Sequence, residues 1–253
     1  MKKVILEAKN LNKSFANNGV QNHVINNLDL KIYEGDFTVV MGASGSGKST
    51  LLYNISGMDK PNSGEVIYKD TDITKLNEKK MSDFRVNEFG FVFQQVHLVS
   101  NLTVLENILV PGYMNKEKNA SQVKEEALEL LKKLNIENTA NRLPSQVSGG
   151  EAQRGAIARA IINQPGIVFA DEPTGALNRK NTKDVLNLFS DLNKNGQTIL
   201  MVTHDIKAAV FANRVVYIED GQIKGELELP CYDENNIKSR ETQLNSWLDS
   251  LQW

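Results

Sequence analysis

The stretch Gly42-Ala43-Ser44-Gly45-Ser46-Gly47-Lys48-Ser49 decides the fold of this chain. It follows an apolar run at 37–41 and precedes Thr50, where the pattern indicates the start of a helix. A buried strand, a loop of the form G-x-x-x-x-G-K-[ST] and a helix together make a phosphate-binding P-loop. The order of the glycines differs from the G-x-G-x-x-G of dinucleotide-binding folds. The sequence therefore predicts an α/β fold with a nucleotide site, in preference to a Gly/Ser surface turn.

The residue types of this loop suit phosphate chemistry. Backbone N–H groups of a glycine-rich loop can converge on phosphate oxygens at the positive end of the following helix. We expect Lys48 to reach the β- and γ-phosphates and the Ser49 hydroxyl to bind Mg²⁺. The predicted ATP-binding residues of the segment are Gly42, Ser44, Gly45, Ser46, Gly47, Lys48, Ser49 and Thr50.

Composition narrows the class of protein. The chain has 253 residues, 40% hydrophobic and 24% charged, with a net charge of -2 that gives no general reason to expect a nucleic-acid partner. A single cysteine, Cys231, excludes an internal disulfide and suits a reducing cytoplasm. No run approaches the roughly 18 apolar residues of a membrane span, and the N-terminus does not resemble a signal peptide. Any membrane spans are therefore expected in another chain.

We expect an N-terminal antiparallel β subdomain, a mainly parallel core sheet and an inserted helical subdomain, and the hydrophobic pattern indicates the β-rich opening and the helical insertion. Alternation and apolar runs predict strands at 4–8, 28–32, 37–41, 65–69, 89–93, 167–170 and 198–203, a turn at Asn17-Asn18-Gly19, and a hairpin at 214–223. Helical spacing predicts helices at 120–134, 151–163 and 185–192. No strand-like run interrupts 97–162, so we place the helical subdomain there.

Polar residues follow three of these features. Asp171 and Glu172 end a buried strand, where Asp171 is expected to hold Mg²⁺ and Glu172 to polarise the attacking water. His204 follows another strand and could contact the γ-phosphate, although a lone histidine is more often a surface or core residue. Ser148 is a candidate N-cap before Gly149 and Gly150, a helix start that taken alone is as often structural as phosphate-binding.

Together the P-loop, Gln94, the Ser-Gly-Gly-Glu segment at 148–151, Asp171-Glu172 and His204 resemble the ATP-binding cassette (ABC) transporter ATPase over about residues 4–228. The resemblance implies that Phe15, otherwise a candidate core aromatic, stacks on adenine. It also implies that Gln94 senses Mg²⁺ and faces a membrane subunit. The implied catalytic residues are Glu172, His204 and Gln94, and the implied Mg²⁺ ligands are Ser49, Gln94 and Asp171.

The same resemblance implies a composite site. Ser148, Gly149 and Gly150 would bind the γ-phosphate of ATP held by a second copy of the chain, and Gly175-Ala176-Leu177-Asn178 would be the D-loop at that interface. The implied partners are therefore a second cassette and an integral-membrane permease, with no nucleic acid. The implied location is the cytoplasmic face of the membrane.

Finer motifs resemble one subgroup. Residues 84–94, 102–108 and 169–177 are similar to the ATPases of macrolide export, lipoprotein release and antimicrobial-peptide resistance. The pair Gly175-Ala176 most resembles the bacitracin- and lantibiotic-resistance branch. The alternatives are a lipoprotein-release or macrolide-export ATPase, a soluble cassette protein of DNA repair or translation, and a regulatory cassette that binds ATP without turnover.

Three positions depart from the family pattern, and one segment lies outside it. Asn178 replaces the usual Asp of the D-loop, Val147 replaces Leu, and Glu151 replaces the commoner Gln. The ATPase domain is expected to cover 1–228. The tail at 229–253 is expected to form an amphipathic helix, docked on its own domain or contacting the permease or second cassette.

Overall fold

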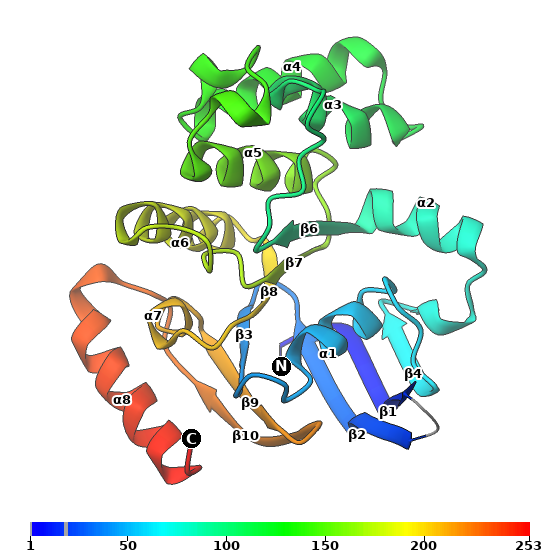
Figure 1. Ribbon diagram of the computed structural model, residues 1–253, viewed down its shortest axis with the longest axis vertical. Helices are drawn as coiled ribbons and strands as arrows, with labels where there is room; N and C mark the ends of the chain where they lie inside the picture. The colour runs from blue at the N-terminus through cyan, green and yellow to red at the C-terminus, as the bar shows by residue number, and fades with distance from the viewer. Residues whose placement is uncertain (1, 18–19) are drawn as a thin grey trace. The chain divides into compact units, whose positions relative to one another are not determined.

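The computed structural model describes residues 2–17 and 20–253 of the chain. It forms two compact units, the first from Met1–Met81 with Leu192–Trp253 and the second from Ser82–Asp191. The fold is mixed α/β, with an antiparallel sheet and a mainly parallel one, as predicted (Figure 1). The turn expected at Asn17-Asn18-Gly19 falls outside the described residues. The predicted extents of the ATPase domain, the helical subdomain and the tail stay predictions.

The antiparallel sheet belongs to the first unit. Its strands lie in the order β2-β1-β4-β5, with bounds β1 Val4–Asn17, β2 Val20–Tyr33, β4 Ser63–Tyr68 and β5 Thr71–Asp72. Leu6, Ala8 and Leu11 of β1 are buried, so one face of the sheet covers a core. The sequence left Leu11 to Phe15 as either a continuation of the strand at 4–8 or a turn, and the structure shows the continuation. Register shifts after Ala8 and Leu11 let β1 bend and keep pairing with β2.

Four further strands of the first unit include the P-loop strand, β3. They lie in the order β10-β9-β3-β8, with bounds β3 Phe37–Met41, β8 Thr198–Val202, β9 Arg214–Glu219 and β10 Gln222–Glu228. Strand β3 pairs in parallel with β8 and β9, and every residue of β3 and β8 is buried. The continuous apolar runs at 37–41 and 198–202 therefore form strands that are buried on both faces of the sheet. The helices of this unit are α1 Lys48–Ile55, α7 Ile206–Ala209 and α8 Ile237–Ser250.

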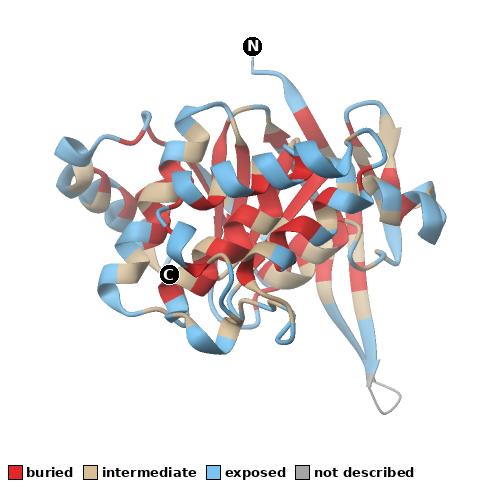
Figure 2. Cartoon of the chain, turned by 90° about the horizontal axis from the view of Figure 1, so that it is seen from above, coloured by how far each residue is buried: buried red, intermediate tan, exposed pale blue. Residues whose placement is uncertain are grey.

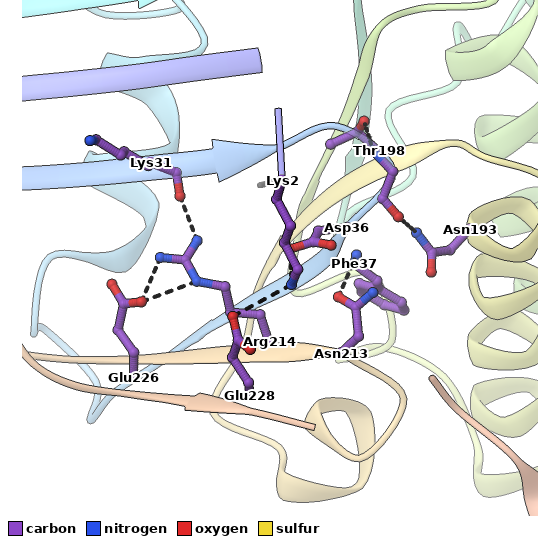
Figure 3. Close-up of polar contacts among 11 residues, drawn as sticks. Lys2, Lys31, Asp36, Phe37, Asn193, Thr198, Asn213, Arg214, Glu226 and Glu228 are labelled. Atoms are coloured by element: carbon purple, nitrogen blue, oxygen red, sulfur yellow. Dashed lines mark hydrogen bonds and ion pairs between the residues drawn. The ribbon is translucent and has the colours of Figure 1, made fainter. Parts of the chain in front are cut away.

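Side chains from neighbouring segments hold the start of β3 (Figure 3). The N–H of Gly35 donates to Thr198 Oγ1 over 2.9 Å, and its carbonyl accepts from Asn193 Nδ2 over 2.8 Å. The N–H of Phe37 donates to Asn213 Oδ1 over 2.9 Å. These bonds satisfy backbone groups beside the first strand residue, which fixes where the P-loop strand begins.

The second unit combines a strand pair with helices. Helix α2 (Glu78–Glu88) leads into it, and β6 (Phe89–Phe93) pairs in parallel with β7 (Ile167–Asp171). The remaining helices are α3 Val104–Met114, α4 Ala120–Lys133, α5 Gly149–Ile161 and α6 Arg179–Lys194. Short 3₁₀ turns lie at Glu137–Thr139 and Pro144–Gln146 in this unit, and at Ile73–Lys75 and Glu234–Asn236 in the first.

The helices of the second unit bury a core of their own. It consists of Val104, Ile108, Leu109, Val123, Ala127, Leu131, Leu134, Ile136, Ala158 and Ile162. The buried residues of α4 recur at the helical spacing that predicted this helix. Buried residues follow the strands and the inner faces of helices, with exposed residues outward (Figure 2).

The tail forms a helix that docks on the first unit. Leu244 and Leu248 of α8 are fully buried, and α8 lies beside α7 and β10 (Figure 1). The buried Arg240 donates from Nε to the carbonyl of Val210 over 2.7 Å and also donates to the carbonyls of Ala212 and Pro230. Docking on its own domain, one of the two expectations for this segment, is therefore what the structure shows.

Candidate nucleotide-binding site

The P-loop leaves β3 and closes over the end of β9. A Cβ on Gly42 would lie 2.3 Å from the carbonyl oxygen of Ile218, so only glycine fits there. Gly45 and Gly47 have φ of +82° and +101°, in the left-handed region that favours glycine. Residues 43–45 are exposed, whereas 46–48 are buried. The first part of the loop is therefore accessible to a ligand, whereas the part that leads into α1 is packed against the protein.

Lys48 lies within the loop that it follows. Its ammonium Nζ donates to the carbonyls of Gly42 and Ala43, each over 2.8 Å, and the residue is 7% exposed. The Lys48 ammonium group is therefore held beside the P-loop backbone, which is expected to surround the phosphates. Ser49 and Thr50 open α1 and are half-buried, which keeps their side chains at the positive end of the helix.

The side chain of Phe15 is exposed, so this ring is not part of the hydrophobic core. It is 46% exposed on β1, opposite Asn22 of β2, and Lys13 Nζ lies 5.0 Å from the centre of the ring. Lys13 is itself fixed by a bond to the carbonyl of Lys60 and an ion pair with Asp59, both at 2.7 Å. The ring therefore offers a face on which a planar base can stack.

His204 follows β8 in the first unit, where it is exposed. The N–H of Thr203 continues the ladder to the carbonyl of Val40 over 3.1 Å, and the N–H of Asp205 donates to Thr203 Oγ1 over 3.0 Å. The Asp205 carboxylate then caps α7 by accepting from the N–H of Lys207 over 2.9 Å. Bonds on both sides therefore fix the backbone that carries His204.

In the second unit, strand pairing aligns the predicted glutamine and acid pair. Phe93 of β6 lies opposite Asp171 of β7, so Gln94 and Glu172 are the next residues on neighbouring parallel strands. Parallel strands present their carboxyl ends at one edge of a sheet, where ligands bind. A Cβ on Gly175 would lie 2.8 Å from Gln94 Nε2, which places the glutamine side chain against the D-loop.

Glu172 has a left-handed backbone conformation, with φ of +47°. Such a conformation costs a non-glycine residue about 1 kcal/mol. The carbonyl of Glu172 accepts from the N–H of Gly175 over 3.0 Å, which closes a tight turn. Strained backbone of this kind is concentrated at functional sites, and here it ends β7 abruptly at the acid pair.

Ser148 is the N-cap of α5, as predicted. Its Oγ accepts from the N–H of Glu151 over 3.3 Å, while the Glu151 carboxylate accepts from the N–H and Oγ of Ser148 over 2.8 and 2.7 Å. These bonds make a capping box. They also hold the pKa of Glu151 below its ordinary range, since the hydrogen bonds favour the charged form.

The D-loop (residues 175–178) and the signature segment (Ser-Gly-Gly-Glu at 148–151) are adjacent within the second unit. A Cβ on Gly149 would lie 3.7 Å from Leu177, and one on Gly150 only 2.6 Å from the side chain of Asn181. Asn178 Oδ1 accepts from the N–H of Asn181 over 3.0 Å at the start of α6. The amide that replaces the usual Asp therefore keeps a hydrogen-bonding role.

Two residues of α5 that the sequence did not single out hold the end of β6 and the segment that follows it. The buried Gln153 donates from Nε2 to the carbonyl of Phe93 over 3.1 Å. Arg159 donates to the carbonyls of His97 and Val96 over 2.6 and 3.2 Å, and burial lowers its pKa. The only available signal was their place on the predicted helix, because their partners lie about sixty residues away in the sequence.

The predicted Mg²⁺ ligands have suitable chemistry. Within the described ranges, no group of three or more His, Cys, Asp or Glu lies together in a way that could hold a metal ion. A nucleotide-bound Mg²⁺ needs few protein ligands, because phosphates and water complete its shell. The Ser49 hydroxyl, the Gln94 amide and the Asp171 carboxylate offer the hard oxygen donors that Mg²⁺ prefers.

Residues 25–175 match the ABC transporter family, and the chain belongs to that family as an ATP-binding cassette. The chain is 44% identical over 225 residues to the ABC transporter ATP-binding protein YxdL of Bacillus subtilis, covering 88% of this chain and 86% of that protein. It is 36% identical over 256 residues to the macrolide export ATP-binding/permease protein MacB of Pasteurella multocida. That match covers all of this chain but only 38% of MacB.

Solved structures agree with the family assignment. The fold matches the dimeric post-hydrolysis structure of the ATP-binding cassette MJ0796 bound to ADP and Pi, with a TM-score of 0.82 and 38% identity. The match covers 90% of this chain and all of that one. Among the described residues, none of the helices has the length and apolar character that crossing a membrane requires.

Proposed function

We propose that the chain hydrolyses ATP as the motor subunit of a bacterial ABC transporter, paired with a second cassette and an integral-membrane permease. Two cassettes would close over two ATP molecules because Ser148, Gly149 and Gly150 of each add donors to phosphate already held by the partner's P-loop. Hydrolysis would remove the γ-phosphate that both halves contact, and the pair would reopen. The two states would then differ in contacts to one phosphate group.

Each predicted site residue has a role in this proposal. Phe15 would stack on adenine, and Lys48 with the P-loop amides would bind the phosphates. Glu172 would accept a proton from the attacking water, and His204 would contact the γ-phosphate. Ser49, Gln94 and Asp171 would hold Mg²⁺, which supplies charge neutralisation at the phosphates when it is bound.

The observation that carries the proposal is the register of β6 and β7. Pairing of Phe93 with Asp171 sets Gln94 beside Glu172 at one strand edge, with the glutamine also against Gly175 of the D-loop. The residues that we propose as the base, the polar sensor and the interface loop are therefore neighbours in the second unit.

Glu172→Gln tests the proposed chemistry. The amide keeps the size of the side chain but cannot accept the proton, so turnover should fall by roughly 100-fold or more. Phosphate release at saturating Mg-ATP is the measurement. The matched control is Glu125→Gln on the exposed surface of α4, which makes the same charge change and should leave turnover unaltered. An unchanged rate in Glu172→Gln would contradict the assignment of the base.

The transported molecule is proposed from resemblance. We favour antimicrobial-peptide resistance because of the Gly175-Ala176 pair, with macrolide export as the second candidate because the MacB relatives carry that name. Exposed apolar residues on α3, namely Val110, Tyr113 and Met114, support a permease surface and a location on the cytoplasmic face of the membrane. Co-purification of this chain with an integral-membrane protein from its native membranes would test the partner. Purification of this chain without any membrane protein bound to it would count against a transport role.

A further inference from the structure

The turn between β9 and β10 touches the P-loop. Asp220 and Gly221 form this turn with φ of +49° and +72°. The N–H of Gly221 donates to the carbonyl of Ser46 over 3.2 Å, so the turn bonds directly to the phosphate-binding loop. Gly42, at the start of that loop, packs on the carbonyl of Ile218 just before the turn. The end of β9 and the turn after it therefore contact the loop at Gly42 and at Ser46.

Strand β2 contacts the same two segments. The carbonyl of Val24 lies between two glycines, because a Cβ would come within 2.8 Å of it on Gly47 and within 2.3 Å on Gly221. The N–H of Asn26 donates to the carbonyl of Gly221 over 3.1 Å, and its side chain donates to the carbonyl of Asp220 over 3.3 Å. Strand β2, the P-loop and the turn at Asp220-Gly221 therefore meet at the Val24 carbonyl, where neither glycine has room for a side chain.

Strand β2 also pairs with the residue whose ring is expected to stack on adenine. Phe15 lies opposite Asn22 on the stretch of β2 that contains Val24 and Asn26. The strand that positions the ring is therefore the strand against which the P-loop packs. Displacement of the turn would therefore act on the P-loop and on β2, which both contact it.

We propose that Gly221 is a positioning residue of the nucleotide site, which holds the P-loop against β2 in the conformation that binds the phosphates of ATP. This inference rests on the proposed function, because the ligand is the nucleotide that the P-loop binds. Gly221 makes no contact with substrate in the proposal. It acts through Ser46 and Gly47, whose backbone belongs to the loop.

Gly221→Ala is the primary test, with Gly35→Ala as its matched control. Both glycines lie in turns of the first unit, with nearly equal φ of +72° and +74°. A Cβ on Gly35 meets nothing within 4 Å, whereas one on Gly221 would meet backbone of β2. The control therefore reproduces the conformational strain of alanine without the collision. Any excess effect of Gly221→Ala comes from displacement at the junction.

The measurement is the Kd for ATP and for ADP by calorimetry, together with the thermal midpoint of each variant. We expect Gly221→Ala to raise both Kd values about tenfold over Gly35→Ala, since small misplacements of binding groups are costly. We also expect KM for ATP to rise by more than kcat falls. Equal Kd values in the two variants would overturn the inference while leaving the proposed function intact. Failure of the wild-type chain to bind ATP would instead refute the proposed function.

A milder variant keeps the test usable where Gly221→Ala does not fold. Asn26→Ala removes only the side-chain bond to the carbonyl of Asp220 at a half-buried position. We expect it to raise the Kd for ATP about threefold with the thermal midpoint within a few degrees of wild type, since one hydrogen bond is lost. A wild-type Kd in this folded variant would argue against positioning by the turn.

Discussion

Glu151 shows how one substitution in a signature segment acts through the cap of a helix. Its carboxylate accepts two hydrogen bonds from Ser148 at the positive end of α5. A glutamine at this position could accept the same bonds but would lack the charge. The family departure therefore replaces a neutral cap by an anionic one, which the helix dipole favours.

The anionic cap predicts a pH dependence. The pKa of Glu151 is lowered by the hydrogen bonds from Ser148, so its contribution to stability is fully present above the ordinary Glu value and is lost as the pH falls through the lowered pKa. The thermal midpoint of the wild type should therefore fall relative to that of Glu151→Gln as the medium becomes more acidic than the ordinary value of 4.5. A pKa for Glu151 at or above 4.5 by NMR titration would contradict this account.

At the scale of elements, hydrophobic periodicity explains which helices the sequence predicted, and the caps at helix starts were a signal left unused. Helix α4 was predicted from its periodicity, and a cap by Asn119 marks its start. Helix α3 begins at an equally clear capping box, Thr103 with Glu106, which local rules could have identified. Helix α2 has an N-cap, since Asn77 Oδ1 accepts from the N–H of Lys80 over 2.9 Å, but it lacks an apolar face, because only Met81 of it is buried.

Contacts between distant segments lay beyond local rules. The Asp220-Gly221 hairpin was predicted from its turn residues, yet its bond to Ser46 depends on how β9 lies beside β3. The same holds for Gln153, whose partner is on β6. Motifs identify groups that carry chemistry, whereas the residues that position those groups emerge only from packing.

Helix α8 is held by one buried cation, which predicts a large effect of removing it. Arg240 is 2% exposed and donates to the carbonyls of Val210, Ala212 and Pro230. Arg240→Met would leave these carbonyls without the guanidinium, so we expect a loss of about 3 kcal/mol or more in the free energy of unfolding. Urea denaturation is the measurement. Lys238→Met, on the exposed side of α8, is the control, and equal effects of the two would contradict the anchoring role.

At the scale of the whole molecule, the predicted site residues divide between the two units. The first contains the P-loop, Phe15 and His204, and the second contains Gln94, Asp171-Glu172, the signature segment and the D-loop. A solved cassette of the same fold is a dimer bound to ADP and Pi. We therefore expect ATP, when the base is disabled, to hold two chains together through Ser148 to Gly150.

The most direct measurement is the mass of Glu172→Gln in solution with Mg-ATP and with Mg-ADP, by light scattering during size-exclusion chromatography. The account predicts a dimer with ATP and a monomer with ADP, because only ATP supplies the γ-phosphate that both chains contact. A monomer under both conditions, in protein that binds ATP, would contradict the account.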